Sequence, residues 1–196
     1  IVPWNFPAYC VVLKCAPALA AGNTLILKPS ELSSRSAIRL AQLALEAGIP
    51  SGVFNVVPGT GEIVGKALAL HQQVDLITFT GSTAVGQSIM QYAGQSNLKR
   101  VMLECGGKSP HIVFDDGVDL DTAADAITQL ILTNQGQICS AGTRLLVQET
   151  IEEVLLEKVA TRFEKMVLGD PLDPETTFGP LATAKQYARV MRYIES

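Results

Sequence analysis

The chain has 196 residues, of which 47% are hydrophobic and 17% are charged, and its formal net charge is −4. A charged share below the typical value of about 25%, together with this apolarity, excludes an intrinsically disordered chain. The weakly acidic balance provides no electrostatic basis for binding nucleic acid or an anionic membrane. No apolar run approaches the roughly 18 residues that would span a bilayer, and no segment resembles a signal peptide.

The four cysteines indicate a reducing compartment. They have no metal-ligand spacing, and they are too sparse for the disulfide scaffold of a small secreted domain. These residues are Cys10, Cys15, Cys105 and Cys139. We therefore expect a cytoplasmic protein without a metal site.

Several features suggest a portion of a larger protein. The sequence begins Ile-Val-Pro-Trp without Met, and it ends within a helical pattern that starts near Thr183. High apolarity with low charge is also typical of an interior slice whose covering parts have been removed. The alternative is a small and unusually apolar domain.

The first half of the chain alternates between β-rich runs and helical patterns. A helix is expected over Pro7–Ala21, with Pro near its start and Gly22 at its end. Later helices are expected from Ser33 or Ser34 to before Gly48, up to about Leu70, and over Ala84–Tyr92. The expected strands are Thr24–Lys28, Val53–Val57, Val74–Phe79 and Arg100–Glu104. Nearly continuous apolar strands in this order predict a parallel sheet with helices on both faces.

The pattern changes after Glu104, where Gly106 and Gly107 interrupt the chain. The expected elements that follow are a strand at His111–Phe114, a helix at Leu120–Leu132, a strand at Thr143–Gln148, a helix at Glu152–Met166 and a Pro- and Asp-rich loop at Gly169–Pro180. A polar loop, Asn134–Gln137, precedes Cys139. We therefore predict two domains, over residues 1–103 and 104–196.

Two loops that join a strand to a helix are candidates for phosphate binding. Pro58–Gly65 carries a G-x-G-x-x-x-G pattern, one residue longer than the usual dinucleotide fingerprint, and a tight turn alone would also explain its glycines. Thr80–Gly86 supplies hydroxyl and N–H groups at a helix N-terminus, which favour an anion. An ordinary Ser or Thr N-cap is the alternative for this second loop.

Lys28 and Glu31 follow the first predicted strand, at the carboxyl edge where open parallel sheets bind ligands. The Glu31 carboxylate could accept a hydrogen bond from a ribose 2′-hydroxyl, and the Lys28 ammonium could donate to neighbouring hydroxyls. A solvated surface pair is the alternative interpretation.

Cys139 is the best candidate for a nucleophile, because it alone among the cysteines lies in a polar loop. Cys10 and Cys15 lie in an apolar helical segment, where cysteine commonly packs as a small hydrophobe. Glu104, at a strand end before two glycines, is the best candidate for a positioned base. Neither His71 nor His111 has a sequence partner, so a Cys–His dyad is not supported.

Six motifs together resemble the aldehyde dehydrogenase superfamily over the whole chain. They are Pro3–Pro7 (PWNFP), Lys28–Glu31 (KPSE), Phe79–Thr83 (FTGST), Glu104–Pro110 (ECGGKSP), Asn134–Cys139 (NQGQIC) and Phe178–Leu181 (FGPL). The resemblance implies a Rossmann-like NAD-binding part over residues 1–103 and the start of a catalytic domain over 104–196.

The resemblance also implies roles for individual residues. Cys139 matches the nucleophile, Asn5 the side-chain donor to the oxyanion, and Glu104 the base that activates water. The implied contacts with NAD are Val2, Pro3, Trp4, Lys28, Glu31, Gly61, Gly65, Phe79, Gly81, Ser82, Thr83, Val85, Gly86 and Cys105. NAD is expected to be preferred, although Lys28 leaves room for NADP.

The implied activity is hydrolytic aldehyde oxidation, with a small aldehyde as substrate and a homo-oligomer as the full-length form. The motifs most resemble those of the family branches that act on aminoaldehydes, betaine aldehyde and γ-glutamyl-aminobutyraldehyde. A CoA-acylating semialdehyde dehydrogenase is one alternative, but such enzymes generally lack the base that Glu104 matches. A non-catalytic relative is another, although Cys139 and Glu104 are both retained. Complete members are more than twice as long, so the chain alone is expected to be inactive.

Overall fold

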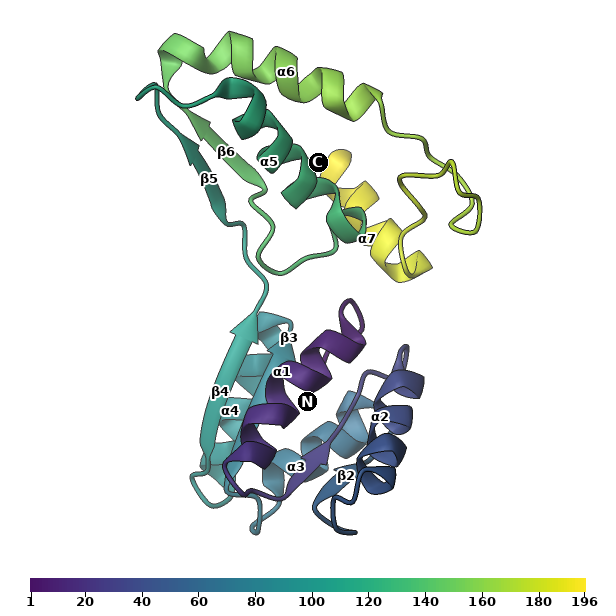
Figure 1. Ribbon diagram of the computed structural model, residues 1–196. Coiled ribbons are helices and arrows are strands. Elements are labelled where there is room, and N and C mark those ends of the chain that lie inside the picture. The colour runs from purple at the N-terminus through teal and green to yellow at the C-terminus, as the bar shows by residue number, and fades with distance from the viewer. The chain divides into compact units, whose positions relative to one another are not determined.

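Parallel strand pairs with helices packed against them make up the computed structural model, which describes residues 1–196 (Figure 1). The chain forms two units, Ile1–Gly106 and Gly107–Ser196. The unit boundary therefore lies between the paired glycines. The assignment of the first unit to NAD binding and of the second to catalysis stays a prediction.

The first unit has the alternating order that its sequence predicts. Its elements are α1 (Pro7–Ala20), β1 (Leu25–Leu27), α2 (Ser34–Glu46), β2 (Phe54–Val56), a π-helical turn (Gly61–Gly65), α3 (Lys66–Leu70), β3 (Leu76–Gly81), α4 (Thr83–Gln95) and β4 (Arg100–Cys105). β1 pairs with β2 and β3 pairs with β4, both in parallel.

The extended segment at Ile1 and Val2 lies between these two strand pairs. The Ile1 amino group donates to the Thr78 carbonyl at 2.8 Å, and the Ile1 carbonyl accepts from the Thr80 N–H at 3.1 Å. On its other side, the Val2 N–H donates to the Lys28 carbonyl at 3.1 Å. The backbone order across the first unit is therefore β2, β1, residues 1–2, β3 and β4.

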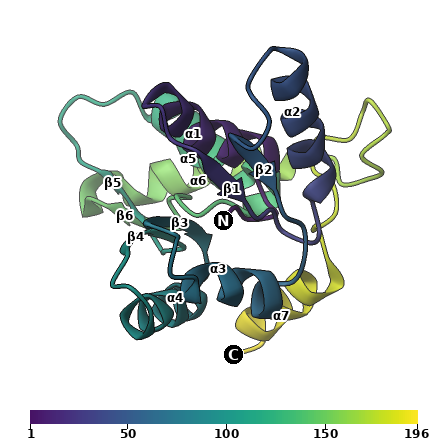
Figure 2. The same ribbon diagram turned by 90° about the horizontal axis from the view of Figure 1, so that it is seen from below.

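Apolar side chains cover both faces of these strands. One buried cluster packs beneath α1 and α2 and consists of Val2, Cys10, Val11, Cys15, Leu27 and Ala37. The other packs beneath α3 and α4 and consists of Ala69, Ile77, Phe79 and Ile89. Figure 2 shows α1 and α2 on one side of the strands and α3 and α4 on the other. The predicted α/β, Rossmann-like class with helices on both faces is confirmed.

Two local details differ from the expectation. Ser33 occupies the N-cap position of α2 but makes no capping hydrogen bond, and its buried hydroxyl has no partner. The helix expected up to Leu70 begins as the π-helical turn at Gly61–Gly65.

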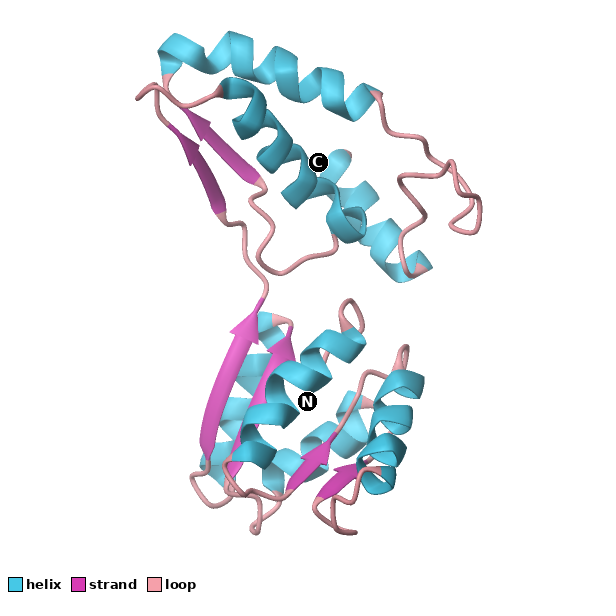
Figure 3. Cartoon of the chain, viewed as in Figure 1, coloured by secondary structure: helices cyan, strands magenta, loops and turns pink.

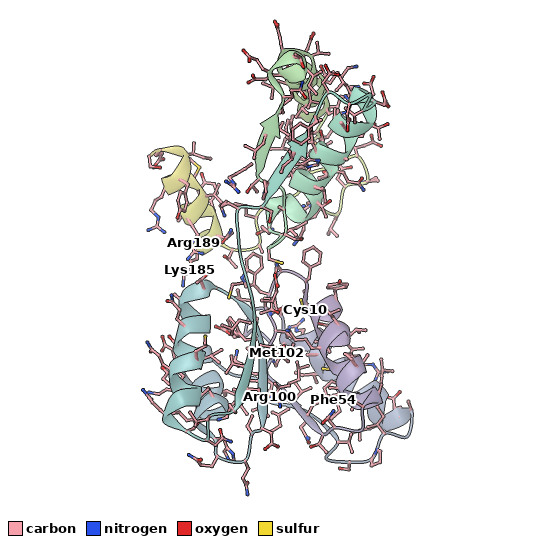
Figure 4. All side chains as sticks on the ribbon, turned by 90° about the vertical axis from the view of Figure 1, so that its left-hand side faces the viewer. Cys10, Phe54, Arg100, Met102, Lys185 and Arg189 are labelled. Carbon is pink, nitrogen blue, oxygen red and sulfur yellow. The ribbon has the colours of Figure 1, made fainter.

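The second unit consists of a parallel strand pair with helices. Its elements are β5 (Pro110–Val113), α5 (Leu120–Leu132), a 3-10 turn (Thr133–Gly136), β6 (Arg144–Val147), a 3-10 turn (Glu149–Ile151), α6 (Glu152–Glu164) and α7 (Ala184–Ile194) (Figure 3). Asp119 caps α5, because its carboxylate accepts from the N–H groups of Asp121 and Thr122. On α7, Lys185 and Arg189 lie one turn apart and are exposed (Figure 4).

The core of the second unit holds α5 and α6 together. It contains Val113, Ala123, Ala124, Ile127, Ile151, Leu155 and Val159. Arg162 and Lys158 on α6 also pair with Asp121 on α5, at 3.2 and 2.8 Å. The hydrogen bond from Lys158, and to a smaller extent that from Arg162, lowers the pKa of the Asp121 carboxyl. The Asp121 side chain is exposed, so these ion pairs contribute little and apolar packing is the main stabilising contribution.

Leu155→Ala should destabilise the second unit strongly, because the Leu155 side chain is fully buried between helices. Removing a buried leucine side chain typically costs about 2–5 kcal/mol. The free energy of unfolding in urea measures this loss. The neighbouring Leu156, 46% exposed, provides the matched control, and Leu156→Ala should cost less than about 1 kcal/mol. Equal losses in both variants would contradict the assigned core.

Candidate active site

Three segments with predicted cofactor contacts meet at one edge of the first unit. β1 runs into Lys28–Glu31, and β3 runs into Ser82. The parallel hydrogen bonds of Ile1 and Val2 bring Pro3 and Trp4 to the same edge. This is the carboxyl edge of the strands, where parallel α/β sheets bind ligands.

Lys28 and Glu31 form a half-buried pair at this edge. The Lys28 ammonium donates to the Pro29 carbonyl at 2.9 Å and to Glu31 Oε2 at 3.4 Å. The Lys28 side chain is 4% exposed, whereas the Glu31 side chain is 56% exposed. An open depression of about 510 Å³ lies beside Glu31, lined by residues 31–36. The carboxylate is therefore held from below and is accessible from outside, so the pair is more than a solvated surface contact.

Ser82 is the N-cap of α4, and its Oγ accepts from the Val85 N–H at 3.4 Å. The capping interpretation of this loop is therefore correct. The capping bond uses the oxygen only as an acceptor, so the Ser82 hydroxyl keeps its proton for donation to an anion. Thr83 begins the helix, and Val85 is 47% exposed in its first turn.

Close packing accounts for two glycines in the predicted phosphate-binding loops, Gly59 and Gly86. Gly59 has φ +145°, and a Cβ there would lie 2.5 Å from Val64 Cγ2, so the turn before Gly61 and Gly65 requires glycine. A Cβ on Gly86 would lie 3.2 Å from Cys105 Sγ, which means that α4 approaches β4 closely at this point.

Phe79 is a predicted cofactor contact that lies in a hydrophobic core. It is only 5% exposed and belongs to the core beneath α3 and α4. A Cβ on Gly81 would lie 2.4 Å from the Phe79 ring, so the ring packs beneath the Gly81 backbone. Phe79 therefore supports the edge from below.

Glu104 lies on β4, opposite Thr80 of β3, and is exposed. Strand register and alternation place Thr78, Thr80 and Glu104 on the same face. Lys14 of α1 reaches this face, and its ammonium donates to Thr78 Oγ1 at 2.7 Å.

Lys14 is a functional candidate that the sequence analysis missed. Burial lowers the pKa of Lys14, while the charges of Cys10 and Glu104 act in the opposite direction. Cys10 lies on the same helix (Figure 4). The available signal was a single charge within the apolar helix sequence. Asn5, in the bend that leads into α1, is partly buried.

The loop before Cys139 has an unusual backbone. Asn134, Gln135 and Gly136 have φ values of 53°, 56° and 71°, so three consecutive residues are left-handed. Left-handed backbone is costly for residues other than glycine, so surrounding contacts must maintain this turn. Cys139 follows it and is partly exposed.

The other cysteines differ from Cys139 in environment. Cys10 and Cys15 are buried in the first unit, as expected for small hydrophobic residues. Burial raises the pKa of the Cys15 thiol, which makes it less reactive. A larger depression of about 1070 Å³ lies between α5 and α6, and it is lined by none of the predicted site residues.

Comparison with known proteins identifies the family. The model of the "Aldehyde dehydrogenase family" matches residues 1–196. The chain belongs to the aldehyde dehydrogenase family. It is 55% identical over 181 residues to the NADP/NAD-dependent aldehyde dehydrogenase PuuC of Escherichia coli, covering 92% of this chain and 37% of that protein.

Two solved structures of aldehyde dehydrogenases are also similar to this chain. One is the γ-glutamyl-γ-aminobutyraldehyde dehydrogenase of Burkholderia cenocepacia, with a TM-score of 0.94, 57% identity, and coverage of 98% of this chain and 39% of that chain. The other is AldA of P. syringae, an indole-3-acetaldehyde dehydrogenase in complex with NAD+ and IAA, with a TM-score of 0.95, 52% identity and the same coverage. This aldehyde dehydrogenase chain thus spans less than two fifths of the length of these relatives.

Within this aldehyde dehydrogenase chain, the predicted site residues lie in both units. Asn5, Glu104 and the predicted cofactor contacts lie in the first unit, and Cys139 lies in the second. None of the helices combines the length and the apolarity needed to cross a membrane.

Proposed function

We propose that the complete protein oxidises an aldehyde to a carboxylic acid and reduces NAD. The observation that carries the proposal is the family match over all 196 residues, with Cys139 and Glu104 both in place. The overall reaction converts aldehyde, NAD+ and water to carboxylate, NADH and two protons. NADH formation with a panel of amino, aliphatic and aromatic aldehydes tests it, and no aldehyde-dependent NADH with any of them would refute it.

The donor set at the carboxyl edge of the first unit fits NAD. The exposed Glu31 carboxylate suits a ribose 2′-hydroxyl, and the Lys28 ammonium lies directly beneath it. The Ser82 hydroxyl and the N-terminus of α4 suit the pyrophosphate. No atom lies within 4 Å of a Cβ placed on Gly61, so there is space beside this turn.

Cys139, Asn5 and Glu104 carry the proposed chemistry. The Cys139 thiolate attacks the aldehyde carbon, and the resulting oxyanion accepts hydrogen bonds from the Asn5 amide and the Cys139 N–H. NAD, when bound, supplies the hydride acceptor that converts the thiohemiacetal to a thioester. Glu104 then takes a proton from water, and the hydroxide attacks the thioester carbon and releases the carboxylate and the Cys139 thiolate.

An aminoaldehyde is our proposed substrate class. The support is the identity of 57% to an enzyme described as acting on γ-glutamyl-γ-aminobutyraldehyde. We also propose that the complete protein is a cytoplasmic homo-oligomer, and its sparse cysteines, four in 196 residues, support the reducing compartment.

Glu31→Gln should narrow the preference for NAD over NADP. A 2′-phosphate brings about −1.5 to −2 charges towards the Glu31 carboxylate, which Lys28 only partly offsets. The wild-type protein should therefore favour NAD, and Glu31→Gln should raise kcat/KM for NADP about tenfold, equivalent to about 1.4 kcal/mol.

Steady-state kinetics with both cofactors measure this change. Glu46, an exposed carboxylate paired with Arg39 at 2.7 Å, provides the control, and Glu46→Gln should leave the ratio unchanged. A wild-type protein with higher kcat/KM for NADP than for NAD would show that Glu31 turns away from the ribose.

A further inference from the structure

Gln137 makes the contacts that hold the left-handed turn before Cys139. Its Nε2 donates to the Asn134 carbonyl at 3.0 Å, and its backbone N–H donates to the same carbonyl at 3.1 Å. In return, Asn134 Nδ2 donates to the Gln137 carbonyl at 3.3 Å. These three bonds close the turn that starts at the strained Asn134 backbone.

The same side chain fastens the turn to a distant segment of the second unit. Gln137 Oε1 accepts from the Ala182 N–H at 3.0 Å, across 45 residues of sequence. Ala182 directly precedes Thr183, the N-cap of α7. One amide group therefore joins the loop to the start of α7 while closing the loop on itself.

Cys139 lies between this anchor and a second one. Two residues before it, Gln137 is only 8% exposed, and two residues after it, Ala141 is 2% exposed. The Thr143 N–H donates to the Ala141 carbonyl at 2.8 Å, just before β6. The partly exposed thiol thus projects from a short segment that is fixed at both ends.

We propose that Gln137 is a positioning residue for the Cys139 nucleophile. The proposal rests on the proposed function, since it assumes that Cys139 attacks the aldehyde. Gln137 is buried, and its amide is used by Asn134 and Ala182, so it acts through the loop backbone. A misplacement of about 1 Å in a reacting group can cost about 100-fold in rate. Without the amide, the strained turn relaxes and displaces both the thiol and the Cys139 N–H.

Gln137→Met tests the proposal in the complete protein, because methionine has a similar length and lacks both hydrogen-bonding atoms. The rate of the first-turnover NADH burst should fall at least about tenfold, towards the 100-fold expected for misplacement. The KM for NAD should stay within about twofold, because the predicted cofactor contacts lie in the first unit. Gln129 on α5 is exposed, and Gln129→Met serves as the matched control with an unchanged burst.

Gln137→Glu provides a second test, which does not require the protein to fold with methionine at position 137. One carboxylate oxygen still accepts from the Ala182 N–H, but the other opposes the Asn134 carbonyl. Protonation of the new carboxyl restores a donor to that carbonyl. The ratio of variant to wild-type burst rate should therefore rise as the pH falls from about 8 to about 6, since burial raises the pKa of such a carboxyl.

The outcomes separate this proposal from the proposed function. A wild-type protein without aldehyde-dependent NADH refutes the proposed function. An active wild-type protein whose Gln137→Met variant keeps its burst rate within about twofold refutes the positioning role alone. If Gln137→Met does not fold, a Gln137→Glu ratio that is independent of pH refutes it.

Discussion

Cys139→Ala is expected to abolish aldehyde oxidation in the complete protein while NAD still binds. Among the four cysteines, Cys139 alone lies in a partly exposed polar loop. Its removal leaves no thiol to form the covalent intermediate, so kcat should fall by at least about 10⁴-fold. The measurements are steady-state NADH formation and NAD binding by calorimetry. The dissociation constant for NAD should change by less than about twofold, because Cys139 lies outside the predicted cofactor contacts.

Cys15→Ala is the matched control for this loss. Cys15 is buried in the first unit among apolar side chains, so its replacement should reduce stability slightly and leave turnover intact. If Cys139→Ala keeps its aldehyde oxidation, another group must act as the nucleophile. If it loses NAD binding as well, the loop contributes to the cofactor site.

Glu104→Gln is expected to separate the two halves of the reaction. The amide cannot accept a proton from water, so the thioester should accumulate after a normal first burst of NADH. The steady-state rate should fall by about 10²–10⁴-fold, the usual contribution of a general base. Stopped-flow NADH absorbance resolves both phases. The burst survives in this scheme because attack by Cys139 and hydride transfer precede water activation.

Glu153→Gln, an exposed change on α6, should alter neither phase. A Glu104→Gln variant without a burst would place the carboxylate earlier in the reaction, in the deprotonation of Cys139. Lys14 bears on this outcome because it reaches the strand face that carries Glu104, and the Glu104 charge raises the pKa of Lys14 against the effect of burial.

The sequence alone predicts the helices and strands that depend on neighbouring residues in the chain. Nearly continuous apolar runs such as Val74–Phe79 predict parallel strands, and the structure has β3 at Leu76–Gly81. Contacts distant in sequence could not be predicted in this way. Lys14 meets Thr78 across 64 residues, and Gln137 meets Ala182 across 45.

The backbone conformation of individual loop residues also could not be predicted from the local sequence. Polar residues at 134–137 predict a loop, but they do not predict its three left-handed residues, whose turn the contacts of Gln137 close. The Ser33 hydroxyl shows the opposite case, since a favourable N-cap residue is present and makes no capping bond. Residue type indicates which group is available, and tertiary packing decides whether it is used.

The exposed edge of β4 affects how the 196-residue chain behaves when it is prepared in isolation. It pairs only with β3, so its outer N–H and C=O groups form an edge strand within the described chain. Met102 on this strand is 61% exposed, and Leu103 is 37% exposed on the opposite face (Figure 4 labels Met102). Proteins normally protect such edges with charges, proline or a covering element, because another strand can add to them by β-augmentation. The 196 residues in isolation therefore present a template for strand-to-strand aggregation beside the proposed base, Glu104.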